Sequence, residues 1–266
     1  MNKVKLLAHY LELFILSILI LLFTLLITLK FTLLNEEFVM SKFNDKHYEE
    51  VENFLKKEMK NSMISSGIDN TVIDNMFDKE DIKDTTKQTL DILYKDYTKA
   101  LDVSKIENKL KENIHENLAE KNFETSDEKG LKSFVDSIMT IYKSEFYMFD
   151  KLSTIGKIIT RVSTIVDIVL IVLGILIVLE LLIRIKKLPK KLPVPLFTSS
   201  FLLLFGTIYI YEKAGIANFT IISLPFSKII RELISSTFHI YQVIAIIFIM
   251  VGILLSLFYK KKVELK

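Results

Sequence analysis

Asp167 is an acidic residue inside the hydrophobic segment that runs from Val162 to Ile183. It follows Arg161 by six residues, which is roughly 9 Å along a helix that rises about 1.5 Å per residue. Ionisable groups at such a depth in a membrane usually face other helices, and they often mark the path of an ion or a substrate. His239 and Gln242 begin another hydrophobic segment and would lie at a similar depth. The spacing therefore predicts a candidate intramembrane polar site made of Asp167, His239 and Gln242.

A structural role for Asp167 is the competing interpretation. A carboxylate this near the membrane interface can be reached by water, and Ser163 or Thr164 could donate a hydrogen bond to it. An ionisable group is most costly at the centre of the bilayer, and this position lies away from the centre. Both interpretations remain open on the sequence alone.

Glu180 and Arg184 are a second charged pair, at the opposite end of the same segment. They are four residues apart on a helix with the acid before the base, which is the favourable order for an ion pair. We expect an interface pair in which the Arg184 side chain extends toward the lipid headgroups. A proton or ion site built from Glu180 with His9 and Glu12 is conceivable, although charges at membrane interfaces are ordinary.

Motifs of known catalytic or cofactor chemistry are missing from the sequence. The four histidines, at positions 9, 47, 115 and 239, lack the spacing of a His-Glu-x-x-His metal site. The seven glycines form neither a P-loop nor a dinucleotide-binding fingerprint, and there is no Gly-x-Ser-x-Gly elbow. The absence of cysteine removes disulfides and thiolate metal ligands. We therefore expect no catalytic, cofactor-binding or metal-binding residues, and we favour a protein that is not an enzyme.

Basic residues cluster at the ends of the hydrophobic segments. By the positive-inside rule, such clusters lie on the cytoplasmic side of a membrane. One orientation places all of them there, with both termini in the cytoplasm and residues 35–160 outside the cell membrane. The topology determinants are Lys3, Lys5, Arg184, Lys186, Lys187, Lys190, Lys191, Lys260, Lys261 and Lys262. Only three of the 35 cations are arginine, which argues against a nucleic-acid partner.

Four hydrophobic segments predict an all-α polytopic protein embedded in the lipid bilayer. A transmembrane helix needs about 20 mostly apolar residues, and the segments cover residues 11–29, 162–185, 196–211 and 240–259. The expected parts are an N-terminal anchor (1–34), an extracytoplasmic helical domain (35–153), and a three-span membrane domain (154–266) with a basic cytoplasmic loop (184–193). The third segment is short for a span, because Pro193 and Pro195 are expected to break the helix before it.

Residues 224–238 have an amphipathic helical pattern between the last two segments. Phe226, Ile229 and Leu233 recur at helical spacing, and polar or charged residues occupy the opposite face. Pro225 suits the first turn of a helix. We expect a separate helix at the outer surface of the membrane, with its apolar face in the interface.

The long polar stretch between the first two segments has the periodicity of a helical bundle. Residues 35–160 carry 19 lysines and 26 acidic residues, a net charge of −7. Apolar residues repeat at three- and four-residue steps without strand-like alternation, so we expect four main helices that begin near residues 44, 78, 104 and 126. Asp78 should cap the second, and Ser104 with Glu107 should form a capping box for the third. Only Gly156 weakens the helix between the fourth and the second span, so these two should join with little break.

The layout of one span, a helical domain of about 120 residues and three further spans resembles uncharacterised four-span membrane proteins of low-GC Gram-positive bacteria. The stretch His47-Tyr48-Glu-Glu-Val51, leading to Met63 and Gly67, is similar in style. The resemblance covers the whole chain but contains no specific motif. It implies a cell-membrane protein and assigns no catalytic or binding residue.

A non-enzymatic integral membrane protein is the function class that these patterns favour. Its helical domain would recognise a protein partner or signal to the membrane segments, as a subunit of an envelope complex or as a sensor. The alternative is a transporter or ion-coupled membrane component that uses Asp167 near His239 and Gln242. An enzyme acting on lipid or peptidoglycan intermediates ranks last, because only the amphipathic segment supports it.

Overall fold

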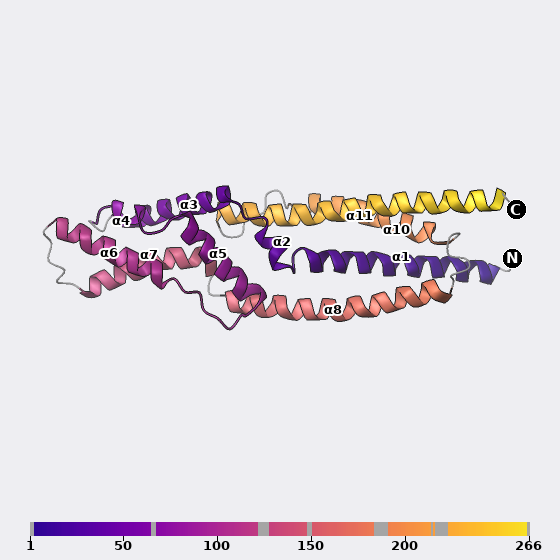
Figure 1. Ribbon diagram of the computed structural model, residues 1–266, viewed down its shortest axis with the longest axis horizontal. Helices are drawn as coiled ribbons and strands as arrows, with labels where there is room; N and C mark the ends of the chain where they lie inside the picture. Colours follow the sequence, from indigo (N-terminus) through magenta and orange to yellow (C-terminus); the bar gives the residue numbers. More distant parts are fainter. Residues whose placement is uncertain are drawn as a thin grey trace. The chain divides into compact units, whose positions relative to one another are not determined.

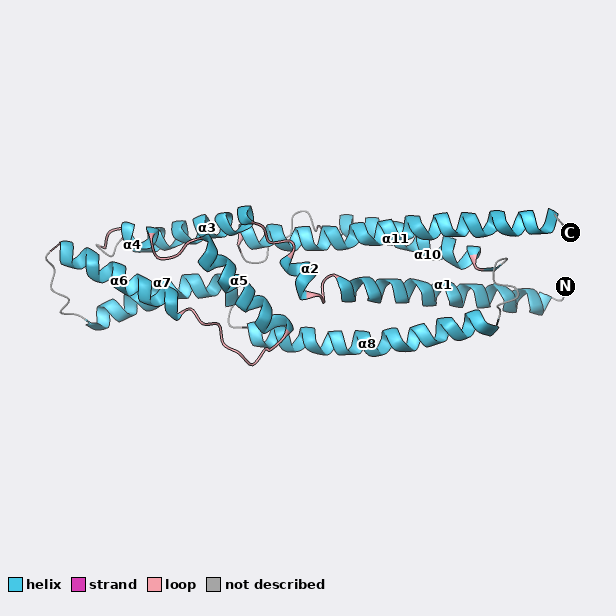
Figure 2. Ribbon diagram, in the orientation of Figure 1, coloured by secondary structure: helices cyan, strands magenta, loops and turns pink. Residues whose placement is uncertain are grey.

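The computed structural model describes residues 3–64, 68–121, 128–147, 151–183, 191–213, 215 and 223–264. Every helix or strand assigned within these ranges is an α-helix (Figure 2), so the expected all-α fold is confirmed. The chain divides into two compact units. Unit 1 comprises Met1–Asn35, Val162–Phe219 and Arg231–Lys266, and unit 2 comprises Glu36–Arg161 and Thr220–Ile230.

Among the described residues, four helices are long and apolar enough to cross a membrane. They are α1 (Lys3–Phe31), α8 (Leu152–Ile183), α10 (Pro193–Lys213) and α11 (Leu224–Glu264) (Figure 1). The first residues of α8 and α11 belong to unit 2, and each helix continues into unit 1 without interruption. Only 11% of the apolar window of α8 is buried, which leaves most of its surface available to lipid.

Within unit 1, α1 packs against both α10 and α11. The Ser199 hydroxyl of α10 donates to the Ser17 carbonyl of α1 over 2.8 Å. The Tyr241 hydroxyl of α11 donates to the Leu25 carbonyl of α1 over 2.9 Å. Apolar side chains fill the space around these bonds; they are Leu203, Tyr241 and Ala245, packed with Leu21, Leu25, Leu204, Phe238 and Phe248.

Small hydroxyl residues occupy the buried faces of α1 and α10. Ser17, Thr24 and Thr32 each donate to the carbonyl four residues earlier in α1, over 2.7–2.8 Å. Ser200 and Thr207 make the same kind of bond in α10. Residues of this size let two helices approach closely. These five hydroxyl donors are satisfied within their own segments, whereas the buried Thr28 hydroxyl has no hydrogen-bond partner among the described residues.

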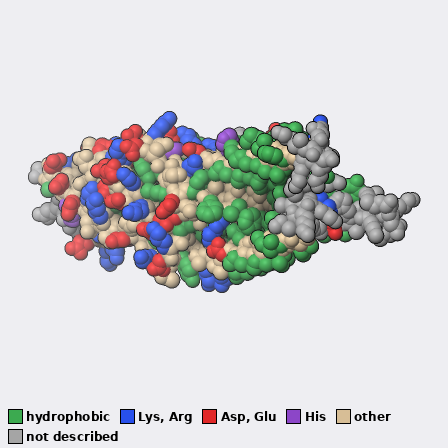
Figure 3. Space-filling model, turned by 45° about the vertical axis from the view of Figure 1, so that its right-hand side comes forward, with side chains coloured by type: hydrophobic (Ala, Val, Ile, Leu, Met, Phe, Trp, Pro, Cys, Tyr) green, Lys and Arg blue, Asp and Glu red, His purple; other side chains and the backbone are tan. Residues whose placement is uncertain are grey.

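Unit 2 is a bundle of shorter helices, whose surface carries charged side chains of both signs (Figure 3). They are α2 (Glu36–Met40), α3 (Asp45–Met63), α4 (Thr71–Asp74), α5 (Lys79–Tyr94), α6 (Ser104–Glu120) and α7 (Glu128–Tyr147). The core includes Tyr48, Val51, Leu55, Met59 and Met63 of α3, Ile106, Leu110 and Ile114 of α6, and Val135, Ile138, Tyr142 and Phe146 of α7. These core residues recur at the three- and four-residue steps that were expected of a helical bundle.

Local polar contacts set the helix starts in unit 2. Asp78 caps α5 in a reciprocal capping box with Asp81, as a side-chain acceptor at this position should. The capping box expected from Ser104 and Glu107 is not formed. Ser104 instead donates its amide and its hydroxyl to the Asp102 carboxylate, because an aspartate two residues earlier offers a closer acceptor.

Three boundaries differ from the expected ones. Pro193 and Pro195 lie in the first turn of α10, where no amide donor is needed, so α10 reaches 21 residues. The amphipathic segment 224–238 is not a separate helix but the beginning of α11, a single helix of 41 residues. The expected domain end at residue 153 falls inside α8, whose residues up to Arg161 belong to unit 2.

Candidate functional site

Asp167 forms an ion pair with Lys30, a residue that its sequence neighbourhood does not indicate. The Lys30 ammonium in the last turn of α1 lies 2.8 Å from Asp167 Oδ2 and 2.7 Å from the Ser163 hydroxyl oxygen. Lys30 therefore bridges two positions one turn apart on α8. The Lys30 and Asp167 side chains are 29% and 50% exposed. This ion pair joins α1 to α8 and supports the structural interpretation of Asp167.

His239 and Gln242 do not join this pair. Both lie on α11, and within the described part of the chain Asp167 is bonded to Lys30 and to neither of them. Tyr241 lies between them in the sequence, and its hydroxyl is directed to the Leu25 carbonyl of α1. Depth along a helix can be estimated from a sequence, but the face that meets a given neighbour cannot.

The interface pair Glu180–Arg184 stays a prediction. Glu180 lies near the end of α8, whereas Arg184 is outside the described residues, as are Lys186, Lys187 and Lys190. Lys191 and Lys260 are described. The remaining topology determinants lie within α1 and α11 but have no described side chains; they are Lys3, Lys5, Lys261 and Lys262.

The Lys30–Asp167 pair should contribute modestly to stability. Ion pairs that water reaches are worth about 0.2–1 kcal/mol. For a pair at the water-accessible membrane interface, Lys30→Ala and Asp167→Asn should therefore each lower the midpoint of thermal unfolding by less than about 4 °C. Combining the two changes should cost no more than one alone, because both remove the same interaction. A double-mutant cycle in detergent measures this coupling, and Lys83 with Glu80, a more exposed pair at 3.5 Å, is the matched control. Additive single effects would contradict the pairing.

Asp81 is a buried carboxylate that connects α5 to α6. Its side chain is 4% exposed, and the ammonium groups of Lys105 and Lys109 lie 2.6 and 3.0 Å from its two oxygens. It also accepts a hydrogen bond from the Asp78 amide. Burial alone would raise the pKa of Asp81, but the hydrogen bonds from the two lysines and the amide together bring that pKa below its ordinary value. The fully paired carboxylate fits a structural role.

Glu145 of α7 is a second buried carboxylate, and only 6% of the residue is exposed. Its Oε1 accepts a hydrogen bond from the hydroxyl of Ser223, the residue before α11. The Ser223 oxygen in turn accepts a hydrogen bond from the Phe226 amide over 3.4 Å, as a helix cap does. Burial raises the pKa of Glu145; the Ser223 hydrogen bond opposes the shift and the charge of Glu58 adds to it.

The start of α8 is packed into the core of unit 2. Leu152 is 1% exposed and belongs to that core. One turn later, α8 passes so close to the C-terminal end of α5 that no side chain fits at Gly156. A Cβ atom there would lie 2.8 Å from Tyr97 Cβ and 2.9 Å from the Ile92 carbonyl oxygen. Gly156 therefore permits a close approach between α8 and α5, a role beyond the helix-weakening effect expected from its sequence position.

The start of α11 is also packed into unit 2. The Phe226 ring lies 5.8 Å from the Phe146 ring and 6.3 Å from the Phe43 ring, centroid to centroid. Two residues after Phe226, the Lys228 ammonium lies 2.8 Å from a carboxylate oxygen of Glu50. Phe226, which was expected to enter the membrane interface, therefore packs against other side chains of unit 2.

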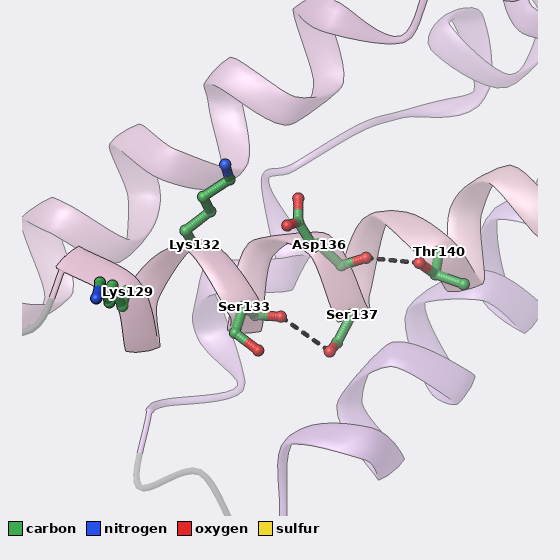
Figure 4. A pocket seen from close by; sticks show the side chains of 6 residues that line it. All are labelled: Lys129, Lys132, Ser133, Asp136, Ser137 and Thr140. Atoms are coloured by element: carbon green, nitrogen blue, oxygen red, sulfur yellow. Dashed lines mark hydrogen bonds between the residues drawn. The ribbon is translucent and has the colours of Figure 1, made fainter.

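A surface hollow of about 360 Å³ lies along the outward side of α7 (Figure 4). The Ser137 and Thr140 hydroxyls in it donate to the Ser133 and Asp136 carbonyls of the same helix. A second hollow, of about 340 Å³, lies between α6 and α7. Among the described residues, no three His, Asp or Glu side chains are arranged to hold a metal ion. These hollows are lined by ordinary surface side chains of a helical bundle.

No protein-family model, curated protein or solved structure matches the chain. The paired starts of α8 and α11 in unit 2 are the feature from which a function can be argued, and we take them as the candidate functional site.

Proposed function

We propose that this chain is a non-enzymatic integral membrane protein that senses the binding of a partner. Unit 2 would recognise a protein partner, and α8 and α11 would pass the bound state to the membrane spans. The observation that carries the proposal is that both helices begin with residues packed in the core of unit 2 and continue as single helices through apolar segments.

The proposed topology places unit 2 on the outer side of the cell membrane and both termini in the cytoplasm. It is supported by the basic residues at the chain ends and after α8, which the positive-inside rule assigns to one side. The partner would then be another envelope protein, such as a subunit of the same complex. Interleaved charges on the surface of unit 2 would favour a polar interface with such a partner.

To transmit partner binding, a structural element must have two conformations. Binding of the partner must shift the equilibrium between them. The start of α11 suits that role, because specific and separable contacts hold it. They are the aromatic packing of Phe226, the Lys228–Glu50 ion pair and the Ser223–Glu145 hydrogen bond. Loss of these contacts would change the position of the start of α11. Because α11 is one continuous helix, the change would extend into the span.

Distances between the spans, measured while unit 2 is perturbed, test the transmission. Because the chain contains no cysteine, spin labels can be attached to Leu176→Cys on α8 and Ile246→Cys on α11, two exposed positions. Phe226→Ala removes the packing against Phe146 and should shift or broaden the distance distribution by about 1–2 Å or more. Leu224→Ala, at a 61% exposed position of the same turn, is the matched control and should leave it unchanged. Identical distributions in all three proteins would contradict the proposal.

Recognition by unit 2 is tested separately, by crosslinking in intact membranes from single cysteines on its surface. Ser137→Cys and Glu116→Cys are suitable, because both positions are exposed and lie on different helices. If the partner binds one face of unit 2, it should be crosslinked to one of these two cysteines and not to the other. A protein that remains a monomer without an enriched partner under all conditions would contradict recognition.

A further inference from the structure

We infer that Glu145 is a proton-binding site that regulates how firmly the start of α11 is held in unit 2. The inference rests on the proposed transmission of partner binding through α11. It adds a second ligand, to which the start of α11 would respond. That ligand is the proton, at the concentration found on the side of the membrane that unit 2 faces.

The surroundings of Glu145 suit a neutral carboxylic acid better than a carboxylate ion. The residue is 6% exposed, and its neighbour Phe146 is 1% exposed. Within the described residues, its hydrogen-bond donor is the Ser223 hydroxyl, which belongs to a residue that is 4% exposed. A carboxylate ion has about four acceptor positions, and leaving most of them without donors in a buried site costs free energy.

The charged groups nearest to Glu145 reinforce this preference. Glu58 of α3 faces it, and two negative charges in proximity disfavour ionisation of either. Lys228, in the first turns of α11, is engaged by Glu50 at 2.8 Å and does not pair with Glu145. The positive end of the α11 dipole opposes these effects, but burial dominates and the pKa of Glu145 is raised.

Charged residues on the other helices that pack against α7 interact with groups other than Glu145. From α5, Asp81 and Asp84 act on Tyr142, one turn before Glu145, and burial with these two charges raises the pKa of that phenol. From α6, Glu107 interacts with Lys111 and with Lys143 of α7. Glu145 is therefore the group whose ionisation directly changes the contact with the residue before α11.

Loss of the proton would weaken the hold on α11. Neutral Glu145 can stay buried beside Ser223, whose oxygen caps α11 through the Phe226 amide. When pH rises through the raised pKa, the proton passes to water and leaves a buried negative charge beside Glu58. Opening of this contact hydrates the charge, so the open state becomes more favourable. The start of α11 is thus held most firmly below the ordinary pKa of glutamic acid, and the hold is lost as pH rises through the raised value.

Hydrogen exchange of the full chain in lipid nanodiscs, followed by mass spectrometry, tests the site. The quantity compared is protection of a peptide covering residues 224–230, between pH 5 and 8. Glu145→Gln, which imitates the neutral acid, serves as the reference in the same buffers and cancels the intrinsic pH dependence of exchange. Relative to it, the opening equilibrium of the wild type should increase with pH, by up to about tenfold for each unit by which the pKa is raised.

Two exposed acids supply the controls. Glu58→Gln removes one cause of the raised pKa, so the pH midpoint of the wild-type response should move downward. Glu116→Gln, on the exposed side of α6, should not move it. A ratio between wild type and Glu145→Gln that is constant with pH would overturn the proton site. That outcome leaves the spin-label test untouched, so failure of the proton site and failure of the transmission are distinguishable.

Discussion

Gly156→Ala should destabilise unit 2 by about 1–3 kcal/mol, although alanine forms helices better than glycine does. The added methyl group would meet Tyr97 Cβ at 2.8 Å and the carbonyl oxygens of Ile92 and Leu93 at 2.9 and 3.3 Å. Backbone oxygens cannot rotate away as the end of a flexible side chain can, so α8 itself would have to move. Thermal or denaturant unfolding of the full chain measures the loss of stability, and hydrogen exchange in α5 and the start of α8 locates it.

Gly206→Ala is the matched control for this substitution. Gly206 is also inside a helix, α10, but a Cβ atom built there meets nothing within 4 Å. Alanine should be neutral there or stabilise the protein by up to about 1 kcal/mol. Opposite signs for the two substitutions would confirm that the close approach, and not helix propensity, decides the result. Stabilisation by Gly156→Ala would show that α8 does not pack against the end of α5.

Phe146→Ala should cost about 3–5 kcal/mol, the range observed when a buried phenylalanine is truncated. The Phe146 ring lies between two others, 5.1 Å from Tyr142 and 5.8 Å from Phe226, and the residue is 1% exposed. The substitution removes both aromatic contacts and leaves a cavity where the start of α11 meets α7. Chemical denaturation provides the free energy of unfolding, and exchange of residues 224–230 should accelerate more than that of α4.

Phe146→Leu and Ile158→Ala complete this test. Leucine refills part of the space, so Phe146→Leu should cost clearly less than Phe146→Ala. Ile158 is 54% exposed at the start of α8, and its truncation should change stability by no more than about 0.5 kcal/mol. A small effect of Phe146→Ala, similar to that of Ile158→Ala, would contradict the packing of α11 on α7.

The sequence predicted the helical class, the candidate spans and the helical periodicity of α3 because a single physical pattern decides each of them. The stripe from Tyr48 to Met63 recurs at helical spacing, and each of its apolar members is buried. Likewise, the Asp78 cap is specified by residues within three positions of it. Local chemistry of this kind can be read without knowledge of distant neighbours.

Pairings between distant segments could not be predicted in the same way. Lys30 and Asp167 are 137 positions apart, and the depth argument that selected His239 and Gln242 carried no information on helix faces. The stripe of Phe226 has a pattern that either lipid or protein can cover, and only the structure shows that Phe226 packs against the core of unit 2. The expected join of the fourth helix with the second span falls on residues 148–150, which lie outside the described residues.

The hydroxyl-lined contact between α1 and α10 has a consequence for biosynthesis. Ser17 and its partner Ser199 are separated by 182 positions, so at roughly 5–20 residues per second Ser17 is added about 10–40 seconds before Ser199. During that interval α1 would reside in lipid without α10. The hydroxyls of Ser17, Thr24 and Thr32 are already bonded to carbonyls of their own helix, so they expose no unsatisfied donor while the ribosome is still at work. These three hydroxyls therefore need no hydrogen-bond partner from α10 during synthesis.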